Sequence, residues 1–503
     1  MTYLLAIDIG TTSTKGLAVT STGEVVASHQ VFYPTQYPTP GHVEQDPEVI
    51  FQAVIKSIQE VSKKTASHRF AGICFSAAMH SVMAVDENGN PITPLIIWAD
   101  TRSSAQSKKI KALGIAQQLY VETGTPVHPM SPLCKLLWWK ENHPEIIERA
   151  NKFISIKEFV IHRLTGEYLI DYSTASATGL FDNEKLKWSV KASELHQLPK
   201  EKFSIPVFIY HQVVGIHSSF AKQMGIDRQS RIIVGASDGC SAQLGSGAME
   251  EGELAITLGT SGAVRMASHK QISDASGRIF NYILDDEFFI CGGATNNGTA
   301  LLNWYTEKFD PTASKNLIEF VDEVNSIAPG ANGLIALPFL LGERAPMYDP
   351  DARGVFFGVS INHTRKHFQR ALIEGICFEL KSIVNAIEQS VGQSKKIIVS
   401  GGFTHSAAWV QILSNVLGRE LVVSDNHDAS ALGAAAIGFK SLNMAFKMDH
   451  AGERIFYPDK SLYDLYEAQF EIFETVYLQL ASSFEKLSDL KLNSSLRTGI
   501  GQG

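Results

Sequence analysis

The sequence has few of the features that would place a protein outside the cell or in a membrane. Its cysteines are odd in number, lie far apart and form no Cys-x-x-Cys motif, which argues against a disulfide framework and against a zinc ribbon. The longest apolar run, near residues 333–342, is much shorter than the ~20 residues of a membrane-spanning helix, and no basic leader precedes Asp8. We therefore expect a soluble protein of the reducing cytoplasm that has no membrane partner.

An excess of positive charge is also missing. The chain has 44 Lys and Arg against 52 Asp and Glu, a net charge of −8, without long runs of one sign. Binding to a phosphate backbone would need a local basic stripe, so nucleic acid is not an expected partner. The 503 residues, 44% of them hydrophobic, exclude a disordered or collagen-like chain and suffice for about two to four domains.

One short motif occurs twice, about half a chain apart. Residues 3–9 form an apolar run that ends at a Gly-Thr-Thr-Ser-Thr segment, and residues 15–19 resume it, which predicts a β-hairpin. The sequence Ala-Ile-Thr-Leu-Gly-Thr-Ser-Gly, which begins at Ala255, matches Ala-Ile-Asp-Ile-Gly-Thr-Thr-Ser, which begins 249 residues earlier at Ala6. Because solenoid repeats recur every ~20–50 residues, this spacing indicates a duplicated domain.

Strand and helix patterns alternate in both halves. Helices are expected over 47–63, with Asp46 as N-cap, over 131–141, 367–389 and 407–417, and from Ser430 onward. Strands are expected over 71–76, 231–235, 396–400 and 420–423. This alternation predicts two α/β domains that face a cleft. We expect the domains to cover residues 1–245 and 246–485, followed by a flexible polar tail over 486–503.

The first turn has the groups that a magnesium nucleotide needs. Asp8 ends an expected buried strand, where its charge is costly unless a cation such as Mg²⁺ with nucleotide phosphates lies opposite. A hairpin turn whose N–H groups bind Asp8 is the alternative. The second copy keeps Gly259 and Thr260 but has Thr257 in place of Asp8, which favours two turns that hold the two ends of a polyphosphate. The residues expected to hold phosphate oxygens in the first turn are Thr11, Thr12 and Ser13.

Two further segments have side chains suited to phosphoryl transfer to a polyol. Asp238 and Gly239 follow the strand expected over 231–235, where an aspartate can take the proton of an attacking hydroxyl, although an isolated Asp-Gly is usually a turn. Residues 98–102 combine an aromatic ring, an acid and a cation, a mixture that polyol recognition uses. A salt bridge beside a packed tryptophan is the alternative for 98–102. Met79 and His80 would, on pattern alone, be core residues.

Together, ordered motifs along nearly the whole chain resemble the FGGY family of carbohydrate kinases. The matching segments are 8–13, 41–47, 79–80, 98–102, Asp238, 259–262, 342–346 and 401–403. The resemblance implies two ribonuclease-H-like α/β domains of the actin-like ATPase kind, with an interdomain cleft. It also implies that ATP and Mg²⁺ take part in the reaction.

The resemblance also implies roles for individual residues. Asp238 matches the catalytic base, and Asp8 the acid that meets the magnesium ion. The implied phosphate contacts are Thr11, Thr12, Ser13, Lys15, Gly259 and Thr260. The implied contacts to adenosine are Thr299, Asn303, Gly402 and Ser406. The implied substrate site comprises Met79, His80, Trp98, Asp100, Arg102, His128, Met130 and Gly239.

Within the family, the substrate segments resemble those of gluconate kinases most. Glycerol kinases have Arg-Glu in place of Met79-His80, and xylulose kinases have Gly where this chain has Ser81, whereas runs 76–81 and 123–132 look like those of gluconate kinases. The resemblance thus implies phosphorylation of gluconate at a terminal hydroxyl. The candidates to receive its carboxylate are Arg102, His80, His128 and Lys135.

Three alternatives remain open from the sequence. A xylulose kinase or other pentulose kinase would use the same chemistry. An ATP-driven switch of the actin or chaperone type is disfavoured because it has no need of Asp238 or of the substrate segments. A catalytically inactive sugar sensor would be expected to have lost Asp8 or Asp238. The expected partner is a small sugar or sugar acid, and a homodimer is left open as the assembly.

Overall fold

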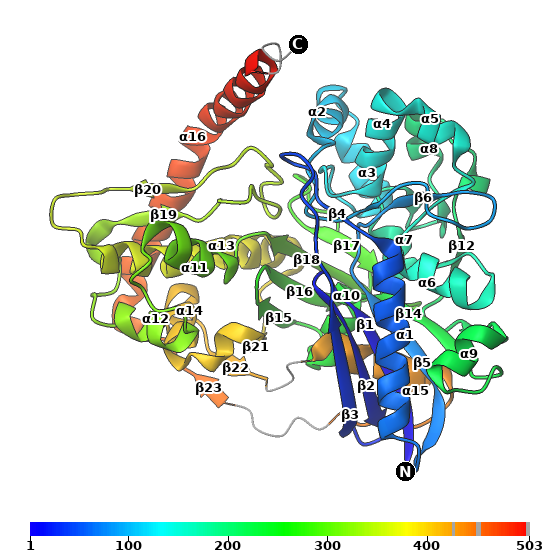
Figure 1. The fold of residues 1–503 in the computed structure, drawn as a ribbon. Helices are drawn as coiled ribbons and strands as arrows, with labels where there is room; N and C mark the ends of the chain where they lie inside the picture. The colour runs from blue at the N-terminus through cyan, green and yellow to red at the C-terminus, as the bar shows by residue number, and fades with distance from the viewer. Residues whose placement is uncertain (425–427, 449–453, 499–503) are drawn as a thin grey trace. The chain divides into compact units, whose positions relative to one another are not determined.

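The computed structural model describes residues 1–424, 428–448 and 454–498, and the side chains of 489 and 491–498 are not described (Figure 1). The chain divides into two compact units that are both discontinuous in sequence. The first comprises Met1–Glu251, Met266–Cys291 and Asp428–Ala451, and the second comprises Gly252–Arg265, Gly292–His427 and Gly452–Gly503. We expected two contiguous domains, 1–245 and 246–485. In the structure, short segments from the second half of the sequence belong to the first unit.

The first unit is built on a six-stranded sheet of order β13-β14-β5-β1-β2-β3. Its strands are β1 (Thr2–Ile9), β2 (Ser13–Thr20), β3 (Val25–Phe32), β5 (Arg69–Ala77), β13 (Gln212–Val213) and β14 (Ile232–Ser237). The strands β14, β5 and β1 are parallel, and β1-β2-β3 form an antiparallel meander. The hairpin expected from the first apolar run is confirmed.

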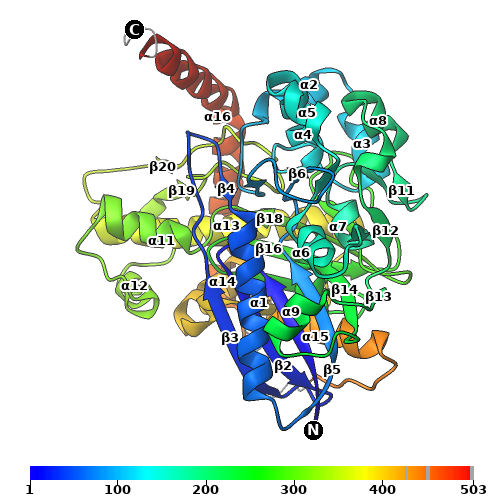
Figure 2. The ribbon, with the colours of Figure 1, turned by 45° about the vertical axis from the view of Figure 1, so that its right-hand side comes forward.

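Helices cover this sheet on both faces. Helix α1 (Pro47–Lys64) packs along β2 and β3, as Figure 2 shows, and Asp46 Oδ1 accepts hydrogen bonds from the first-turn N–H groups as expected. Helix α15 (Ala429–Ser441) packs on β1 and β5. A Cβ at Gly438 of α15 would meet Leu4 and Cys74, whereas Tyr3, Leu5 and Ile7 belong to the core under α1. Alternate residues of β1 therefore face different helices.

The other elements of the first unit comprise one short strand before β5 and a series of short strands and helices after it. They are β4 (Glu44–Gln45), β6 (Met83–Val85), β7 (Leu95–Ile96), α2 (Ser104–Ala112), α3 (Ala116–Thr123), α4 (Pro132–Asn142), α5 (Pro144–Arg149), β8 (Lys152–Ile154), α6 (Ile156–Thr165), β9 (Leu169–Asp171), α7 (Tyr172–Ser176), β10 (Phe181–Asp182), β11 (Lys187–Trp188), α8 (Val190–His196), β12 (Ile205–Val207), α9 (Ser218–Met224) and α10 (Asp238–Ser246).

A seven-stranded sheet of order β17-β18-β16-β15-β21-β22-β23 carries the second unit, and the division between the units falls within β16 and β18. Its strands are β15 (Glu253–Leu258), β16 (Gly262–Ser268), β17 (Phe280–Ile283), β18 (Phe289–Thr295), β21 (Lys396–Ser400), β22 (Leu421–Val423) and β23 (Arg454–Phe456). The other elements are α11 (Ala300–Trp304), α12 (Leu317–Val324), β19 (Ile335–Leu337), β20 (Val355–Phe357), α13 (Arg365–Val391), α14 (Ala407–Leu417) and α16 (Tyr463–Thr498).

The predicted duplication is confirmed by strand register. In the first sheet Asp8 of β1 is paired with Ser76 of β5, and in the second sheet Thr257 of β15 is paired with Ser400 of β21. Both turns close in the same way, because Gly10 N–H donates to Ser13 O at 3.0 Å and Gly259 N–H donates to Ser261 O at 2.9 Å. The two units therefore contain the same hairpin beside the same kind of parallel neighbour.

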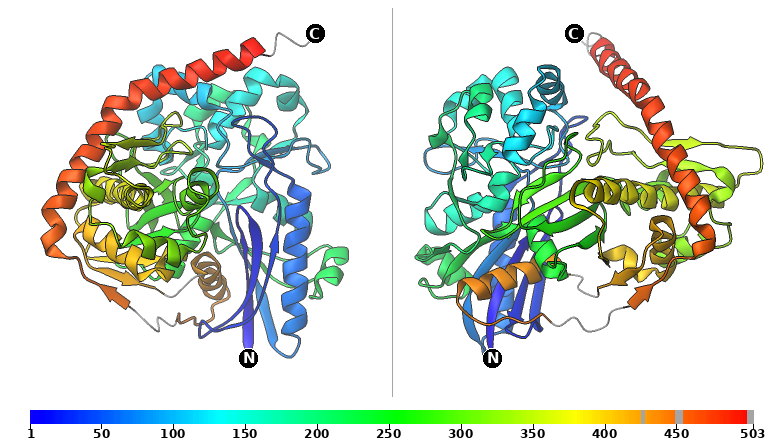
Figure 3. Two further views of the ribbon diagram at one scale, coloured as in Figure 1. Left: turned by 60° about the vertical axis from the view of Figure 1, so that its left-hand side comes forward. Right: turned by 180° about the vertical axis from the view of Figure 1, so that it is seen from behind.

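The C-terminal segment differs from the expected flexible tail. Helix α16 continues to Thr498 and packs on α13 and α14 (Figure 3), and residues 499–503 lie outside the described residues. The reason is that no Gly or Pro interrupts the chain between Lys486 and Thr498, so a polar segment can extend a helix whose first turns are anchored. None of the helices in the described residues combines the length and the hydropathy needed to cross a bilayer.

Two glycines set the close crossing of α10 and α15. A Cβ at Gly245 would lie 1.8 Å from Ala429 O, and a Cβ at Gly433 would lie 1.9 Å from Ser241 O. We expect Gly433→Val to lower the free energy of unfolding by about 1 to 3 kcal/mol, the usual cost of overpacking. Urea denaturation measures this effect. Ala436→Val, at a half-buried position of the same helix, is the control. Equal free energies of unfolding for the two variants would contradict the claim that Gly433 is needed for the close contact of α10 and α15.

Candidate active site

Strand register in the first unit aligns one residue from each of four neighbouring strands, and three of these residues are polar. Strand register aligns Ala236 of β14, Ser76 of β5, Asp8 of β1 and Lys15 of β2. Ser76 Oγ donates a hydrogen bond to Asp8 Oδ1 at 2.9 Å. The parallel strands β14, β5 and β1 all end at this edge, and Asp238 follows two residues after Ala236. The structure therefore brings Asp8 and Asp238 together, although 230 residues separate them in the sequence.

A third acid, Asp428, joins this edge of the sheet. Lys15 Nζ donates to Asp428 Oδ1 at 2.5 Å, and Ser430 Oγ donates to the Asp238 carbonyl oxygen at 3.4 Å. The glycine crossing of α10 and α15 places the start of both helices here. Sequence analysis did not identify Asp428, although its position just before the helix expected from Ser430 was an available signal.

The acids at this edge raise the cost of ionising Asp8. Burial, followed by the negative charge of Asp238, raises the pKa of the Asp8 carboxyl to about 7. The hydrogen bond from Ser76 and the charge of Lys15 act in the opposite direction, and Asp428 adds to the increase. Among the described residues, Lys15 is paired with Asp428. A cation carried by a ligand would lower the cost of ionising Asp8 at this edge.

The turn after Asp8 is held by hydrogen bonds from side chains of three other segments. Tyr33 OH donates to Gly10 O at 2.5 Å, and Gln45 Nε2 donates to Thr11 O at 2.6 Å. Trp98 Nε1 donates to Thr11 Oγ1 at 2.8 Å. Sequence analysis missed Gln45 as a contact, although it lies in the matched segment 41–47. Trp98 therefore binds a residue of the expected phosphate turn directly.

The expected substrate residues Met79 and Gly239 are neighbours. A Cβ at Gly239 would lie 2.8 Å from Met79 Cε, so the end of the Met79 side chain lies against the backbone next to Asp238. A small cavity of about 10 Å³ is lined by Thr11, Met79 and Trp98, among others. The Met79 segment thus lies between the first turn and the residue next to Asp238.

The two histidines of the expected substrate site have opposite tautomers. His80 has a left-handed φ of 65°, and its Nδ1 donates to Ala177 O at 2.7 Å, so that Nε2 accepts from Tyr282 OH at 3.3 Å. His128 Nδ1 instead accepts from Met130 N–H at 3.2 Å, which leaves the proton of the neutral ring on Nε2. His128 is therefore an N–H donor at Nε2. No sequence motif pointed to Tyr282.

Arg102 is held by two acids. Its Nε donates to both carboxylate oxygens of Asp100, at 2.9 and 3.0 Å, and its Nη2 donates to Glu44 Oε1 at 2.6 Å. Its guanidinium also lies 5.1 Å from the centre of the Trp138 ring. Arg102 therefore forms a buried salt bridge with Asp100 and Glu44. Two carboxylates around one cation leave a negative local charge, which disfavours a further carboxylate there.

Lys135 joins two of the expected substrate segments. Its fully buried Nζ donates to His80 O at 2.6 Å and to Ile97 O at 2.9 Å, next to Trp98. Burial lowers the pKa of the Lys135 ammonium to about 7. These bonds give Lys135 a structural role.

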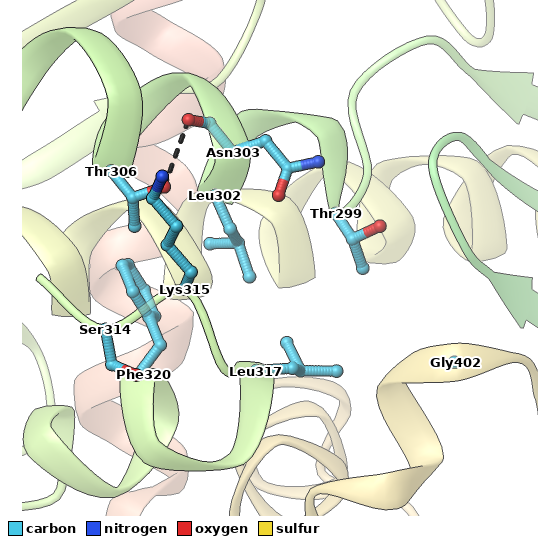
Figure 4. Close-up of a pocket in the computed structure, with 9 residues that line it drawn as sticks. All are labelled: Thr299, Leu302, Asn303, Thr306, Ser314, Lys315, Leu317, Phe320 and Gly402. Carbon is cyan, nitrogen blue, oxygen red and sulfur yellow. Dashed lines mark hydrogen bonds between the residues drawn. The ribbon is translucent and has the colours of Figure 1, made fainter.

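The second unit contains a pocket of about 190 Å³ that includes most of the expected adenosine contacts (Figure 4). Thr299, Asn303 and Gly402 line it, whereas Ser406 is buried as the N-cap of α14. Thr299 N–H donates to Gly259 O at 2.8 Å, which ties the pocket to the second turn. The lining residues that sequence analysis missed are Leu302, Thr306, Ser314, Lys315, Leu317 and Phe320.

Comparison with known proteins decides the family. The model of the FGGY family of carbohydrate kinases, N-terminal domain, matches residues 3–245, and the model of its C-terminal domain matches residues 254–442. The chain belongs to the FGGY family of carbohydrate kinases. As an FGGY kinase it is a phosphotransferase that uses ATP and acts on the hydroxyl group of a carbohydrate. This membership confirms the expected fold class.

Several relatives of this FGGY kinase have names that specify a substrate. A gluconokinase of Bacillus subtilis (strain 168) is 39% identical over 462 residues, which are 90% of each chain, and a xylulose kinase of Staphylococcus xylosus is 30% identical over 95% of this chain and 100% of its own. The crystal structure of a gluconate kinase from Lactobacillus acidophilus superposes with a TM-score of 0.90 at 32% identity, covering 97% of this chain and 99% of that one.

Proposed function

We propose that this FGGY kinase phosphorylates gluconate with ATP, yielding 6-phosphogluconate and ADP. The observation that carries the choice of substrate is the 39% identity to a gluconokinase over 90% of both chains, against 30% to a xylulose kinase. The polar edge of the first sheet supports the reaction type. There an aspartate at the start of a helix lies beside a turn rich in hydroxyl groups and next to the Met79 segment.

In the proposed reaction Asp238 is the general base. Its carboxylate takes the proton of the terminal hydroxyl, the hydroxyl oxygen forms a bond to the γ-phosphorus, and the bond from that phosphorus to the bridging oxygen breaks, so that ADP leaves with the electron pair. Asp238 Oδ1 accepts the N–H of Gly239 at 2.7 Å, which orients the carboxylate. The remaining rate enhancement comes from positioning and charge neutralisation.

Asp8 is the residue proposed to meet Mg²⁺. No group of three His, Cys, Asp or Glu side chains in the described part of the chain is arranged to hold a metal on its own. Asp8 still fits the ion, because Mg²⁺ is usually bound by one or two carboxylates, several waters and the substrate phosphates. When bound, the ion neutralises charge on the phosphates.

The remaining expected contacts keep their proposed roles. Thr11, Thr12, Ser13 and Lys15 are proposed to bind phosphate oxygens from the first turn, and Gly259 and Thr260 from the second. The pocket of Figure 4 is proposed to receive adenosine through Thr299, Asn303 and Gly402, with Ser406 capping the helix beside it.

For the gluconate carboxylate, the contacts in the structure favour His128 over Arg102 and Lys135. Arg102 is already surrounded by Asp100 and Glu44, and Lys135 donates to two backbone carbonyls. His128 presents a proton at Nε2 in a buried position, where a hydrogen bond to a carboxylate is strengthened by the low dielectric.

An ADP-release assay with gluconate, xylulose, ribulose, glycerol and no sugar tests this proposal. We expect kcat/KM to be highest for gluconate, because a donor left without its carboxylate costs about 1 to 3 kcal/mol, or roughly 5- to 150-fold. His128→Ala should narrow the ratio of gluconate to xylulose more than Arg102→Ala does. Equal or better use of xylulose by the wild type would assign a pentulose kinase.

A further inference from the structure

A fully buried ion pair lies in the first unit, outside the proposed site. Lys157 Nζ on α6 lies 2.5 Å from Asp171 Oδ2, and the two side chains are 1% and 0% exposed. Asp171 is the N-cap of the short helix α7, where its Oδ1 accepts the N–H of Thr174 at 3.0 Å. The reaction proposed above makes no direct use of these groups.

A serine connects this pair to the strand that ends at the proposed base. Ser173 Oγ donates to Asp171 Oδ1 at 2.5 Å and accepts the backbone N–H of Ser237 at 2.7 Å. Ser237 is the last residue of β14 and the N-cap of α10, and Asp238 is the next residue. A continuous chain of contacts therefore runs from Lys157 through Asp171 and Ser173 to the backbone that carries Asp238.

We propose that Asp171 and Ser173 are positioning residues for Asp238, with Lys157 as the ion-pair partner that holds the Asp171 carboxylate in place. This inference rests on the proposed role of Asp238 as general base. An ionised carboxylate only accepts hydrogen bonds, so Ser173 must point its proton at Asp171 and its lone pairs at the Ser237 N–H. The buried charge thereby fixes the direction of each hydrogen bond in the chain.

The reaction requires precise placement of the C-terminal end of β14, because Asp238 follows it directly. A general base must lie within hydrogen-bond reach of the proton that it takes. Loss of the Ser173 acceptor leaves a buried N–H without its partner one residue before the base, which favours a shift of the backbone there. A misplacement of about 1 Å can cost ~10²-fold in rate.

Stability alone does not call for such a pair. Replacement of buried ion pairs by apolar groups of similar volume is often neutral or stabilising, because both charges lose their hydration on burial. The polar chain therefore has its main value in the geometry that it imposes. Its effect should appear in kcat rather than in substrate binding.

Ser173→Ala tests the proposal in the full-length enzyme. We expect kcat to fall about 10- to 100-fold while KM for ATP and for gluconate stays within about twofold. Ser414→Ala is the matched control, since Ser414 is equally buried on α14 and its hydroxyl also donates a hydrogen bond, in this case to Arg419 O, but it lies in the second unit. Melting temperatures of both variants separate loss of fold from loss of turnover.

Two more variants make the outcome decisive. Ser173→Thr keeps the hydroxyl and should restore most of kcat, and Asp171→Asn, which keeps the shape, should lower kcat as Ser173→Ala does. If Asp238→Asn is inactive while Ser173→Ala and Asp171→Asn retain kcat within about twofold, the positioning role is overturned and the proposed function stands. If Asp238→Asn retains wild-type kcat, the base assignment fails and the positioning role fails with it.

Discussion

Asp238→Asn is expected to reduce kcat by about 10² to 10⁴, the usual contribution of a general base. The substitution keeps the size of the side chain and an oxygen that can accept the Gly239 N–H bond, so the start of α10 should stay in place. The dissociation constant of ADP should remain within about twofold. Steady-state kinetics together with a nucleotide titration of the same preparation measure both quantities.

Asp86→Asn is the control for Asp238→Asn. Asp86 is also half-buried, belongs to the first unit and accepts backbone N–H groups, from Asn88 and Asn90, but it lies in a turn away from the edge that carries Asp8. Its turnover should equal that of the wild type. A kcat for Asp238→Asn near that of the control would show that Asp238 is not the general base.

Asp8→Ala is the second variant with a large expected effect. Loss of the carboxylate that meets the magnesium nucleotide should lower kcat/KM for ATP by about 10- to 100-fold, which corresponds to roughly 1.4 to 2.7 kcal/mol of lost transition-state stabilisation. The magnesium concentration that gives half-maximal rate should rise. A magnesium titration at fixed ATP measures this shift, and an unchanged curve would exclude the role.

The stability of an Asp8 variant should change in the opposite sense to its activity. Because burial and Asp238 raise the pKa of Asp8 to about 7, the folded state binds its proton more tightly than the unfolded state does. The ionised group therefore costs stability as the pH rises from about 4 to 7. Asp8→Asn removes this cost, so the free energy of unfolding of the variant at pH 8 should be no lower than that of the wild type. A lower value would indicate that Asp8 stabilises the fold, whereas an equal or higher value indicates that it serves the reaction.

The sequence predicted the elements whose signals are local. The hairpin at Gly10 and its copy at Gly259 follow from apolar runs stopped by Gly and Thr, and the start of α1 follows from Asp46 and Pro47. Asp8 could be singled out because a charge at the end of an apolar strand needs a partner. Each of these depends on residues within a few positions of one another.

What the sequence did not predict depends on distant contacts. Asp428 meets Lys15 across 413 residues, and no periodicity marks that pairing. Tyr282 reaches His80 from β17, and its segment carried no motif. The sequence shows an aromatic ring, an acid and a cation within residues 98–102, but only the structure shows that Glu44 adds a second carboxylate beside Arg102. Such partners are set by packing of the whole unit.

The most direct test of the proposed gluconate kinase activity is the turnover of the wild-type enzyme with gluconate, with xylulose or without sugar. A coupled assay measures ADP, and phosphorus NMR and mass spectrometry identify the product. The account predicts one phosphomonoester of gluconate for each ADP released, a kcat/KM for gluconate above that for xylulose, and little ADP without sugar. Phosphorylation of xylulose as fast as gluconate, or ADP release without a sugar phosphate, would contradict it.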